Sequence, residues 1–247
     1  MFQLVKKSNI RVKRVNLQVI FENKITPSDC ANLLSSLIEY ILIQFQQLPG
    51  CPRTFYVRNS NVSSITEDQI CSVFINEEHS RKELHKLLSD FNILKQTLKE
   101  EIEDGSITDL ELHIGSGPPF TDHLVHVSVP PLSEKLDGEP TFISKNMGIL
   151  FKKICECEEL QNAVDDVRPS KIDVFFAKQL HARSRNFFPV KRFVDCASKS
   201  HINVEFLVRP EIDTDNQPQS ISVSQQVDWY RMQGIRGFGM AHLFSNH

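Results

Sequence analysis

The order of patterned segments along the chain restricts the possible folds more than any other feature of this sequence. Apolar residues recur at helical spacing in three long stretches, at residues 26–47, 80–104 and 143–164. The alternation of apolar and polar residues that is typical of strands marks residues 10–21, 107–114, 123–129, 171–179, 190–196, 201–208 and 221–235. Because this order contains no regular repeat of strand, helix and strand, it favours an α+β fold with a mainly antiparallel sheet over a doubly wound fold.

The size and charge of the chain restrict its domain number and its possible functions. The chain has 247 residues and no convincing linker divides it, so we expect one domain with its own core. Lysine and arginine total 28 against 31 acidic residues, a balance that argues against a general nucleic-acid binder. The N-terminus lacks a signal-like apolar run and no stretch is long enough to span a membrane, so we expect an intracellular protein with six reduced cysteines.

No local pattern of residues predicts a metal site or a catalytic centre. Cys155 and Cys157 lie two apart on a predicted helix and therefore point in different directions. His123 and His126 lie three apart on a predicted strand, hence on opposite faces, and we interpret them as solvated side chains. The sequence contains no nucleophile elbow or Walker-type lysine. We expect no cofactor, no metal and no enzyme activity, and the alternative is an α+β hydrolase or transferase that uses Cys196 or a histidine with an acid.

The helix predicted at residues 143–164 carries an aromatic residue beside its apolar stripe. At about 100° per residue, Phe151 lies roughly 80° from Ile143 of the stripe. Its flank is shared with Ser144, Gly148 and Cys155. In one interpretation Phe151 widens the apolar face, which in globular proteins often exceeds about 100°. In the other, the ring is exposed and anchors a protein partner, because desolvated aromatic residues dominate binding energy at interface centres.

Gln44 has a comparable position at the edge of the apolar stripe of the first predicted helix. It lies beside Tyr40 and Gln47 on that helix. A glutamine at such an edge is usually solvated. At an interface, its amide would supply a pair of hydrogen bonds.

A basic stretch with aromatic residues follows the strand predicted at residues 171–179. Its members are Arg183, Arg185, Lys191 and Arg192, interrupted by Phe187-Phe188-Pro189. The stretch is too short and isolated for a nucleic-acid patch. A loop that presents charge and aromatic rings to an acidic protein partner fits this pattern, and so does a solvated turn between strands.

Four segments, taken together, resemble a known family. They are residues 41–49 (ILIQFQQLP), 150–154 (LFKKI), 186–189 (NFFP) with the strands that follow, and 227–238, from VDWY through GF. Their order and spacing over nearly the whole chain resemble the comet family of HORMA-fold adaptors, which silence the spindle assembly checkpoint. The resemblance implies a HORMA-like domain over residues 1–239, with three helices packed on a mainly antiparallel sheet and a C-terminal safety-belt region. Residues 240–247 form a tail beyond the family pattern.

The resemblance also implies a function, as a non-enzymatic adaptor. Such an adaptor binds the closed form of the checkpoint HORMA protein, the mitotic-arrest-deficiency inhibitor of anaphase, in a pseudo-symmetric heterodimer. It then presents this partner to a hexameric AAA+ remodelling ATPase, which promotes disassembly of the mitotic checkpoint complex. The implied location is the nucleus and cytoplasm, with the spindle or kinetochore in mitosis. A HORMA-type adaptor of meiosis or autophagy is the alternative.

Two sets of contact residues follow from the resemblance. Phe151 and Gln44 match the aromatic and glutamine positions that bind the partner. The residues expected beside them on the dimer interface are Ser144, Gly148, Lys152 and Cys155. Pro189, Lys191 and Arg192 match the loop that meets the ATPase. The first set predicts an exposed aromatic ring on the third helix, and the second predicts an exposed basic loop.

Overall fold

The computed structural model describes most of the regions predicted to be regular. The described residues are 12–49, 78–117, 120–133, 140–163, 170–180, 182–184, 186–191, 198–209, 227–232 and 234–237. Their helices are α1 (Pro27–Gln44), α4 (Glu78–Ile102), α5 (Pro140–Glu156) and α6 (Glu158–Gln161). None of these described helices is long and apolar enough to span a bilayer. The tail predicted at residues 240–247 lies outside the described residues, as do Arg192 and Cys196.

The strands of the described chain form one sheet. They are β1 (Lys13–Phe21), β2 (Ile107–Gly117), β3 (Phe120–Ser128), β4 (Lys171–Gln179), β5 (Pro189–Val190), β6 (Ser200–Val208), β7 (Val227–Arg231) and β8 (Ile235–Arg236). Their order is β1-β6-β3-β2-β4-β7-β5, with β8 paired to the beginning of β4. The pairings are antiparallel, except that β6 runs parallel to both of its neighbours, β1 and β3. The predicted α+β class with a mainly antiparallel sheet is therefore confirmed.

The pairing of β1 with β6 joins two strands that lie far apart in the sequence. Lys13 to Phe21 pair with Ser200 to Val208 in unbroken register. The residues of both strands that face the helices are buried, and the rings of Phe21 and Phe206 meet edge to face at 5.5 Å. Because one face of both strands is buried, a shift by one residue would expose these rings, and so the register is strongly specified.

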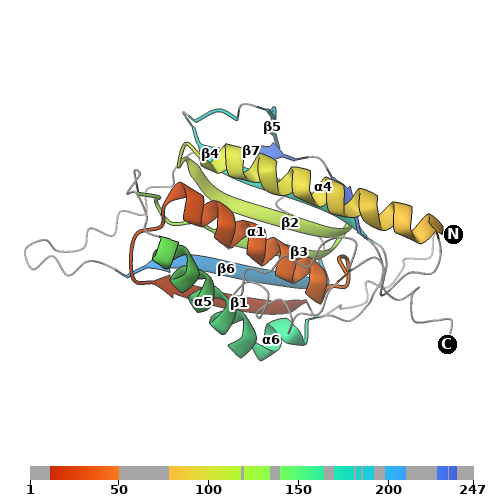
Figure 1. The fold of residues 1–247 in the computed structure, drawn as a ribbon, viewed down its shortest axis with the longest axis horizontal. Coiled ribbons are helices and arrows are strands. Elements are labelled where there is room, and N and C mark those ends of the chain that lie inside the picture. The colour runs from red at the N-terminus through yellow and green to blue at the C-terminus, as the bar shows by residue number, and fades with distance from the viewer. Residues whose placement is uncertain are drawn as a thin grey trace, which may run out of the picture.

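Helices α1, α4 and α5 cross one face of the sheet, with α1 between the other two (Figure 1). The predicted stripe of α1 and its extension are buried at Cys30, Leu34, Leu37, Ile41, Phe45 and Leu48. Further residues of α1 are also buried, at Leu33, Ile38, Tyr40 and Leu42. The buried face of α1 is wider than a single stripe because the helix has a neighbour on each side and the sheet beneath it.

Capping residues set the start of α1 and the end of α4 where the sequence predicts them. Thr26 Oγ1 accepts a hydrogen bond from the Asp29 N–H at 3.1 Å, and Pro27 occupies the first turn. Helix α4 ends at Ile102, and the chain leaves it through Gly105, which has a left-handed φ of 69°. Glycine is favoured there because it has no Cβ to clash with the backbone.

The end of α1 comes earlier than the predicted residue 47. The helix stops at Gln44 because Gln46 adopts the left-handed conformation, with φ of 53°. The N–H groups of Gln46 and Gln47 donate to the carbonyls of Ile43 and Leu42, at 3.0 and 2.7 Å. These two bonds form a Schellman motif, in which the left-handed position is usually a glycine.

Gln46→Gly is expected to raise the free energy of unfolding by about 1 kcal/mol, because glycine avoids the steric cost of the left-handed conformation. Lys86→Gly, at an exposed position within α4, should instead lower it by about 0.5 to 1 kcal/mol. Urea unfolding of both variants beside the wild type measures the two changes. A loss of stability in both variants would show that the backbone of Gln46 is not strained.

The predicted hairpin is confirmed, but its strands run further than expected. β2 and β3 pair from Asp109 with Ser128 to Gly117 with Phe120, so both strands enter the segment predicted to be a long loop. The register shifts at Gly115 and Gly117, where φ is 154° and 100°. Glycine allows these irregularities, which keep the strands paired while the ladder bends.

The third predicted helix is broken at Cys157, so the prediction of a continuous helix to residue 164 is wrong. α5 ends at Glu156 and α6 begins at Glu158, and Cys157 between them has φ of −89° and ψ of 90°. The Cys157 N–H still donates to the Ile154 carbonyl at 3.2 Å. The extended conformation at Cys157 thus gives the described chain a fourth helix, where the resemblance implied three.

Candidate functional site

Four of the residues predicted to bind a partner occupy one stripe of α5. At about 100° per residue, Ser144, Gly148, Lys152 and Cys155 lie within roughly 80° of one another around the helix. Lys152 and Cys155 are exposed. A Cβ at Gly148 would meet no atom within 4 Å. At Gly148, Lys152 and Cys155 this α5 stripe is therefore accessible, and there is open space above its glycine.

Apolar and charged side chains flank the α5 stripe. Met147 and Ile149 pack against the core with part of their surface and leave the rest accessible. A Glu156 carboxylate oxygen lies 3.5 Å from Lys153 Nζ, and the other lies 3.9 Å from Lys152 Nζ. Apolar area bordered by charged groups is the usual composition of a surface that binds a protein.

Phe151 is buried, so the expectation of an exposed aromatic anchor is wrong. Its side chain is 3% exposed and lies in the main core with Leu150 and Ile154. α5 packs against both α1 and β1. Because two neighbours cover its flanks, the apolar face of α5 is wider than the stripe alone. The interpretation in which Phe151 widens the core is the correct one.

Two hydrogen bonds join Gln44 to the end of α5. Gln44 Nε2 donates to the Gln161 carbonyl at 3.2 Å. Gln161 Nε2 donates in turn to the Cys155 carbonyl at 2.7 Å. Gln161 of α6 therefore bridges the ends of α1 and α5 at an exposed rim. In this way the structure brings together two predicted interface residues that come from different helices.

Two titratable groups near this rim, Tyr40 and Cys157, have pKa values that burial raises. Burial, with the nearby thiols of Cys155 and Cys157 as smaller causes, raises the pKa of Tyr40 to about 12. Burial also raises the pKa of Cys157, whose Sγ lies 3.7 Å from a Glu159 carboxylate oxygen. Tyr40 and Cys157 therefore supply neither a phenolate nor a thiolate nucleophile.

Of the two histidines of β3, His123 contradicts the interpretation as solvated side chains, whereas His126 stays partly accessible. His123 is buried, with Nδ1 2.8 Å from Ser200 Oγ, and Ser200 itself is 1% exposed. His126 Nε2 lies 3.1 Å from Asp109 Oδ1. Burial opposes ionisation of Asp109, but hydrogen bonds from His126 and Thr108 keep its pKa below the usual value. Among the described residues, no group of three histidine, cysteine or acidic side chains could hold a metal ion.

The loop predicted to meet an ATPase lies at the outer edge of the sheet. Pro189 begins β5, the edge strand that pairs with β7. Pro189 and Lys191 are exposed, whereas Arg192 lies outside the described residues. Phe188, directly before β5, is 89% exposed. This edge therefore presents an aromatic ring, a proline and a lysine in close succession.

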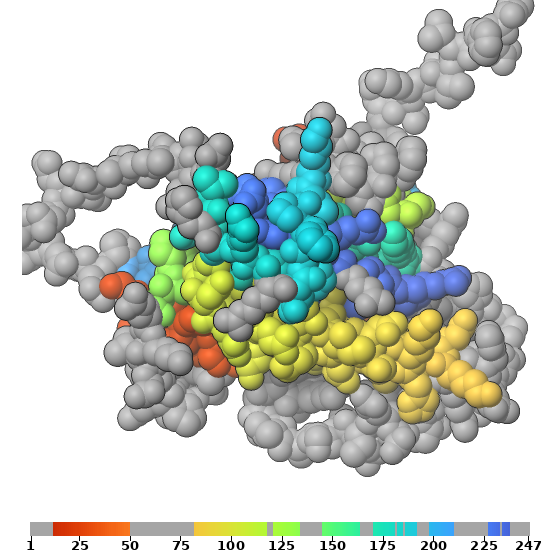
Figure 2. All heavy atoms as spheres, turned by 90° about the horizontal axis from the view of Figure 1, so that it is seen from above, coloured from red at the N-terminus to blue at the C-terminus, as the bar shows by residue number. Residues whose placement is uncertain are grey.

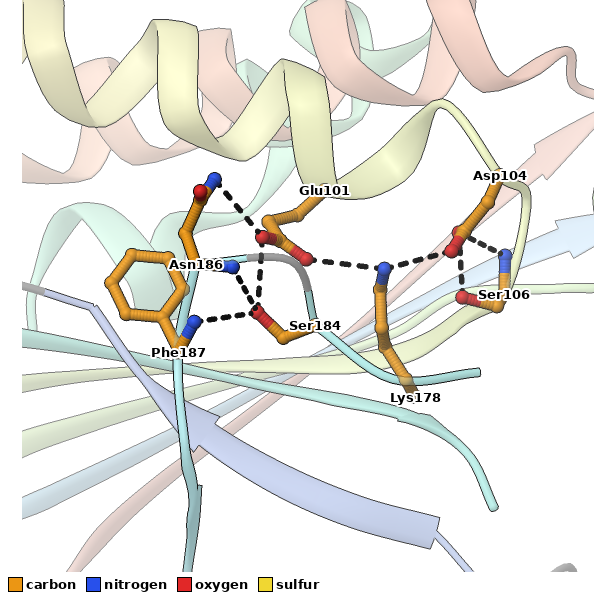
Figure 3. A network of polar contacts seen from close by, with 7 residues as sticks. All are labelled: Glu101, Asp104, Ser106, Lys178, Ser184, Asn186 and Phe187. Atoms are coloured by element: carbon orange, nitrogen blue, oxygen red, sulfur yellow. Dashed lines mark hydrogen bonds and ion pairs between the residues drawn. The ribbon is translucent and has the colours of Figure 1, made fainter. Parts of the chain in front are cut away.

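A buried polar network holds the chain that leads to this loop (Figure 3). Lys178 of β4 is 1% exposed, and its Nζ lies 3.1 Å from Glu101 Oε2 and 2.9 Å from Asp104 Oδ2. Glu101 Oε1 accepts hydrogen bonds from Ser184 Oγ at 3.0 Å and from Asn186 Nδ2 at 3.4 Å. The network thus ties the end of α4 to β4 and to the residues before β5.

No protein-family model matches this chain, and no curated protein matches it. The described part of the chain offers two candidate surfaces. One is the α5 stripe together with Gln44, and the other is the loop at β5 with its buried network.

Asp104 is the more exposed carboxylate of the network. Burial alone would raise the pKa of Asp104, but hydrogen bonds from Ser106 and Lys178 hold it below the usual value. Ser106 Oγ donates to Asp104 Oδ1 at 2.6 Å, and the Ser106 N–H donates to the same oxygen at 3.0 Å. The Asp104 carboxylate is consequently ionised at neutral pH and compensates the charge of Lys178.

Sequence reasoning missed this network, although one signal of it is present. Lys178 continues the series Ile172, Val174 and Phe176, whose side chains face the helices at the two-residue spacing of β4. A lysine at such a position needs a buried anionic partner. The partner, Glu101, lies in a distant helix, and no local pattern identifies it.

Proposed function

We propose that this chain is a non-enzymatic adaptor with a HORMA-like fold. It binds the closed checkpoint HORMA protein and presents it to a hexameric AAA+ remodelling ATPase, which promotes disassembly of the mitotic checkpoint complex and checkpoint silencing. In this proposal α1, α4 and α5 are the helical layer of the fold, and the strands after β4 belong to its safety-belt region. The adaptor acts in the nucleus and cytoplasm, and at the spindle or kinetochore in mitosis.

The observation that carries the proposal is the bridge from Gln44 through Gln161 to Cys155. These bonds fix the end of α1 against the end of α5, so that Gln44 and the α5 stripe form one surface built from two helices. A surface that is already ordered loses less entropy on binding, which supports a role as a docking face.

The α5 stripe suits a partner that lays a helix along it. The open space at Gly148 allows a backbone to approach closely. Met147 and Ile149 then lose accessible apolar area, while Lys152 and Glu156 remain at a polar rim. In a pseudo-symmetric heterodimer, the corresponding helix of the closed checkpoint HORMA protein occupies this position.

The adaptor needs no chemistry of its own to act in this way. A protein shifts a conformational equilibrium only by its differential affinity for the two states. Preference for the closed form of the partner is therefore enough to select the state that must be remodelled, and ATP hydrolysis by the ATPase supplies the energy for opening it.

Gly148→Arg tests the interface without disturbing the fold. The Cβ of the new side chain meets no atom within 4 Å, and loss of a glycine within a helix favours folding by about 0.5 to 1 kcal/mol. We expect the affinity for the closed checkpoint HORMA protein to fall by at least about tenfold, or ~1.4 kcal/mol, because the arginine occupies the place of the partner backbone. Titration calorimetry measures the change.

Ile93→Arg is the matched control, since Ile93 is exposed on α4, away from the stripe. The control should bind the closed partner like the wild type. Equal affinities of Gly148→Arg and wild type would remove α5 from the interface. Binding of the wild-type chain to a HORMA protein of meiosis or autophagy, but not to the checkpoint protein, would assign the adaptor to that other pathway.

A further inference from the structure

Phe188 is the most exposed of the large hydrophobic side chains in the described part of the chain. Its side chain is 89% exposed, whereas the next, Ile93, is 58% exposed. Single exposed hydrophobic residues are common and need no function. Phe188 differs because the backbone on both sides of it is held in place.

The residues before Phe188 are fixed by hydrogen bonds and packing. Ser184 Oγ accepts hydrogen bonds from the N–H groups of Asn186 at 3.3 Å and Phe187 at 3.0 Å. The ring of Phe187 packs edge to face against Phe176 in the core, with 6.0 Å between centroids. Of two successive phenylalanines, the first is therefore an internal anchor and the second points away from the core.

The residue after Phe188 is fixed by the sheet. Pro189 pairs with Tyr230 of β7, and Tyr230 stacks on Phe176 with 5.3 Å between ring centroids. The residue before Phe188 therefore contacts Phe176 directly, and the residue after it is connected to Phe176 through Tyr230. The exposed ring is held on a short, anchored backbone, which reduces the entropy lost when it binds.

The buried ion pair of Glu101 and Lys178 also helps to hold the residues before Phe188 in place. The Ser184 hydroxyl donates to Glu101, and Glu101 is held by Lys178 (Figure 3). In the space-filling view the cyan residues that follow β4 lie directly against the yellow helix α4 (Figure 2). The position of the loop is therefore set by contacts with helix α4 and strand β4.

The chain segment that contains Phe188 carries charged side chains of one sign only. Residues 180–191 contain Arg183, Arg185 and Lys191 and no acidic residue. Arg183 and Lys191 are exposed. An exposed ring on a segment whose charged side chains are all cationic is complementary to an apolar pocket with a rim of carboxylates.

We propose that Phe188 is the aromatic anchor of the loop at β5 and inserts into an apolar, acid-rimmed pocket of the remodelling ATPase. The inference rests on the proposed function and adds to it the residue that contributes most of the apolar contact. Pro189 and Lys191, which the resemblance assigns to the same loop, then border the anchor. An aromatic ring on a rigid backbone is the kind of residue that dominates interface energy.

The test is the affinity of the 247-residue chain for the ATPase hexamer in the presence of ATP, measured by biolayer interferometry. Phe188→Ala should weaken this binding by about tenfold or more, as expected of an anchor residue. Phe188→Trp, which keeps a large aromatic side chain, should retain most of it. Because the ring is exposed, Phe188→Ala should leave the melting temperature and the affinity for the closed checkpoint HORMA protein unchanged.

Ile20→Ala is the matched control, since Ile20 is an exposed apolar residue on β1 at the opposite edge of the sheet. It should bind the ATPase like the wild type. Wild-type affinity of Phe188→Ala, together with weakened binding of Lys191→Glu, would overturn the anchor and leave the proposed function intact. Failure of the wild-type chain to bind either the ATPase or the closed partner would overturn both.

Discussion

Phe151→Ala is expected to lower the free energy of unfolding by about 3 to 5 kcal/mol, the range observed when a buried phenylalanine side chain is removed. The ring lies in the core where α5 packs against α1 and β1. Truncation leaves a cavity that the surrounding helices and strands fill only in part. Urea unfolding followed by circular dichroism measures the loss, provided that the m value is unchanged.

Lys152→Ala is the matched control, because Lys152 is the next residue of the same helix and is exposed. Its unfolding free energy should stay within about 0.5 kcal/mol of the wild-type value. Phe151→Leu keeps most of the apolar volume and should lose less than about 1.5 kcal/mol. Equal stability of Phe151→Ala and wild type would mean that the ring lies at the surface.

The burial of Phe151 also decides how the proposed interface must be tested. A Phe151→Ala variant that fails to bind the closed partner has two explanations, a lost contact and a smaller folded fraction. For Gly148→Arg a lost contact is the expected explanation, because the added Cβ meets no atom within 4 Å and no core side chain is removed. The residue that the resemblance marks most strongly is therefore the less informative one to mutate.

The fold class was predictable because it depends on local patterns. The alternation at residues 171–179 gave β4 with its observed bounds, and Thr26 with Pro27 gave the start of α1. The end of α1 was not predictable from the same rules, since Gln46 occupies a position where glycine is usual. The break at Cys157 also lacks a proline or glycine that would have marked it.

The side-chain environments were harder to predict because they depend on how many elements surround each helix. Helical spacing gives the angle between Phe151 and the apolar stripe, but not the presence of β1 and α1 on its two flanks. The same limit applies to His123, which is buried because Ser200 of β6 and the ring of Phe45 lie against it. Each of these neighbours is distant in sequence, so no local pattern contains it.

The arrangement of the candidate interface residues was predictable in part. Gly148, Lys152 and Cys155 share a helix, and their common stripe follows from their spacing. Their hydrogen-bonded connection to Gln44 does not follow from the spacing. It depends on Gln161 of α6, a helix that the sequence did not separate from α5. The network around Lys178 was not predictable for the same reason, since it joins residues of α4, β4 and the chain before β5, which are distant in sequence.

Lys178→Met is expected to lower the free energy of unfolding by about 3 to 5 kcal/mol, because it leaves the Glu101 carboxylate buried without its cation. Methionine has a similar volume, so the loss comes from the unpaired charge and only slightly from packing. Glu101 Oε2 lies 3.1 Å from Lys178 Nζ, and neither side chain reaches solvent. Lys99→Met, at an exposed position of α4, should change the stability by less than about 0.5 kcal/mol.

Glu101→Gln in the Lys178→Met background should recover part of the lost stability. The amide carries no charge, yet it keeps an oxygen that accepts from Ser184 and Asn186. The double variant should therefore be more stable than Lys178→Met alone, which is the opposite of what independent sites would give. Additive losses in the two positions would show that the charges are not coupled, and the attachment of the loop at β5 to α4 would then depend on Phe187 and the sheet alone.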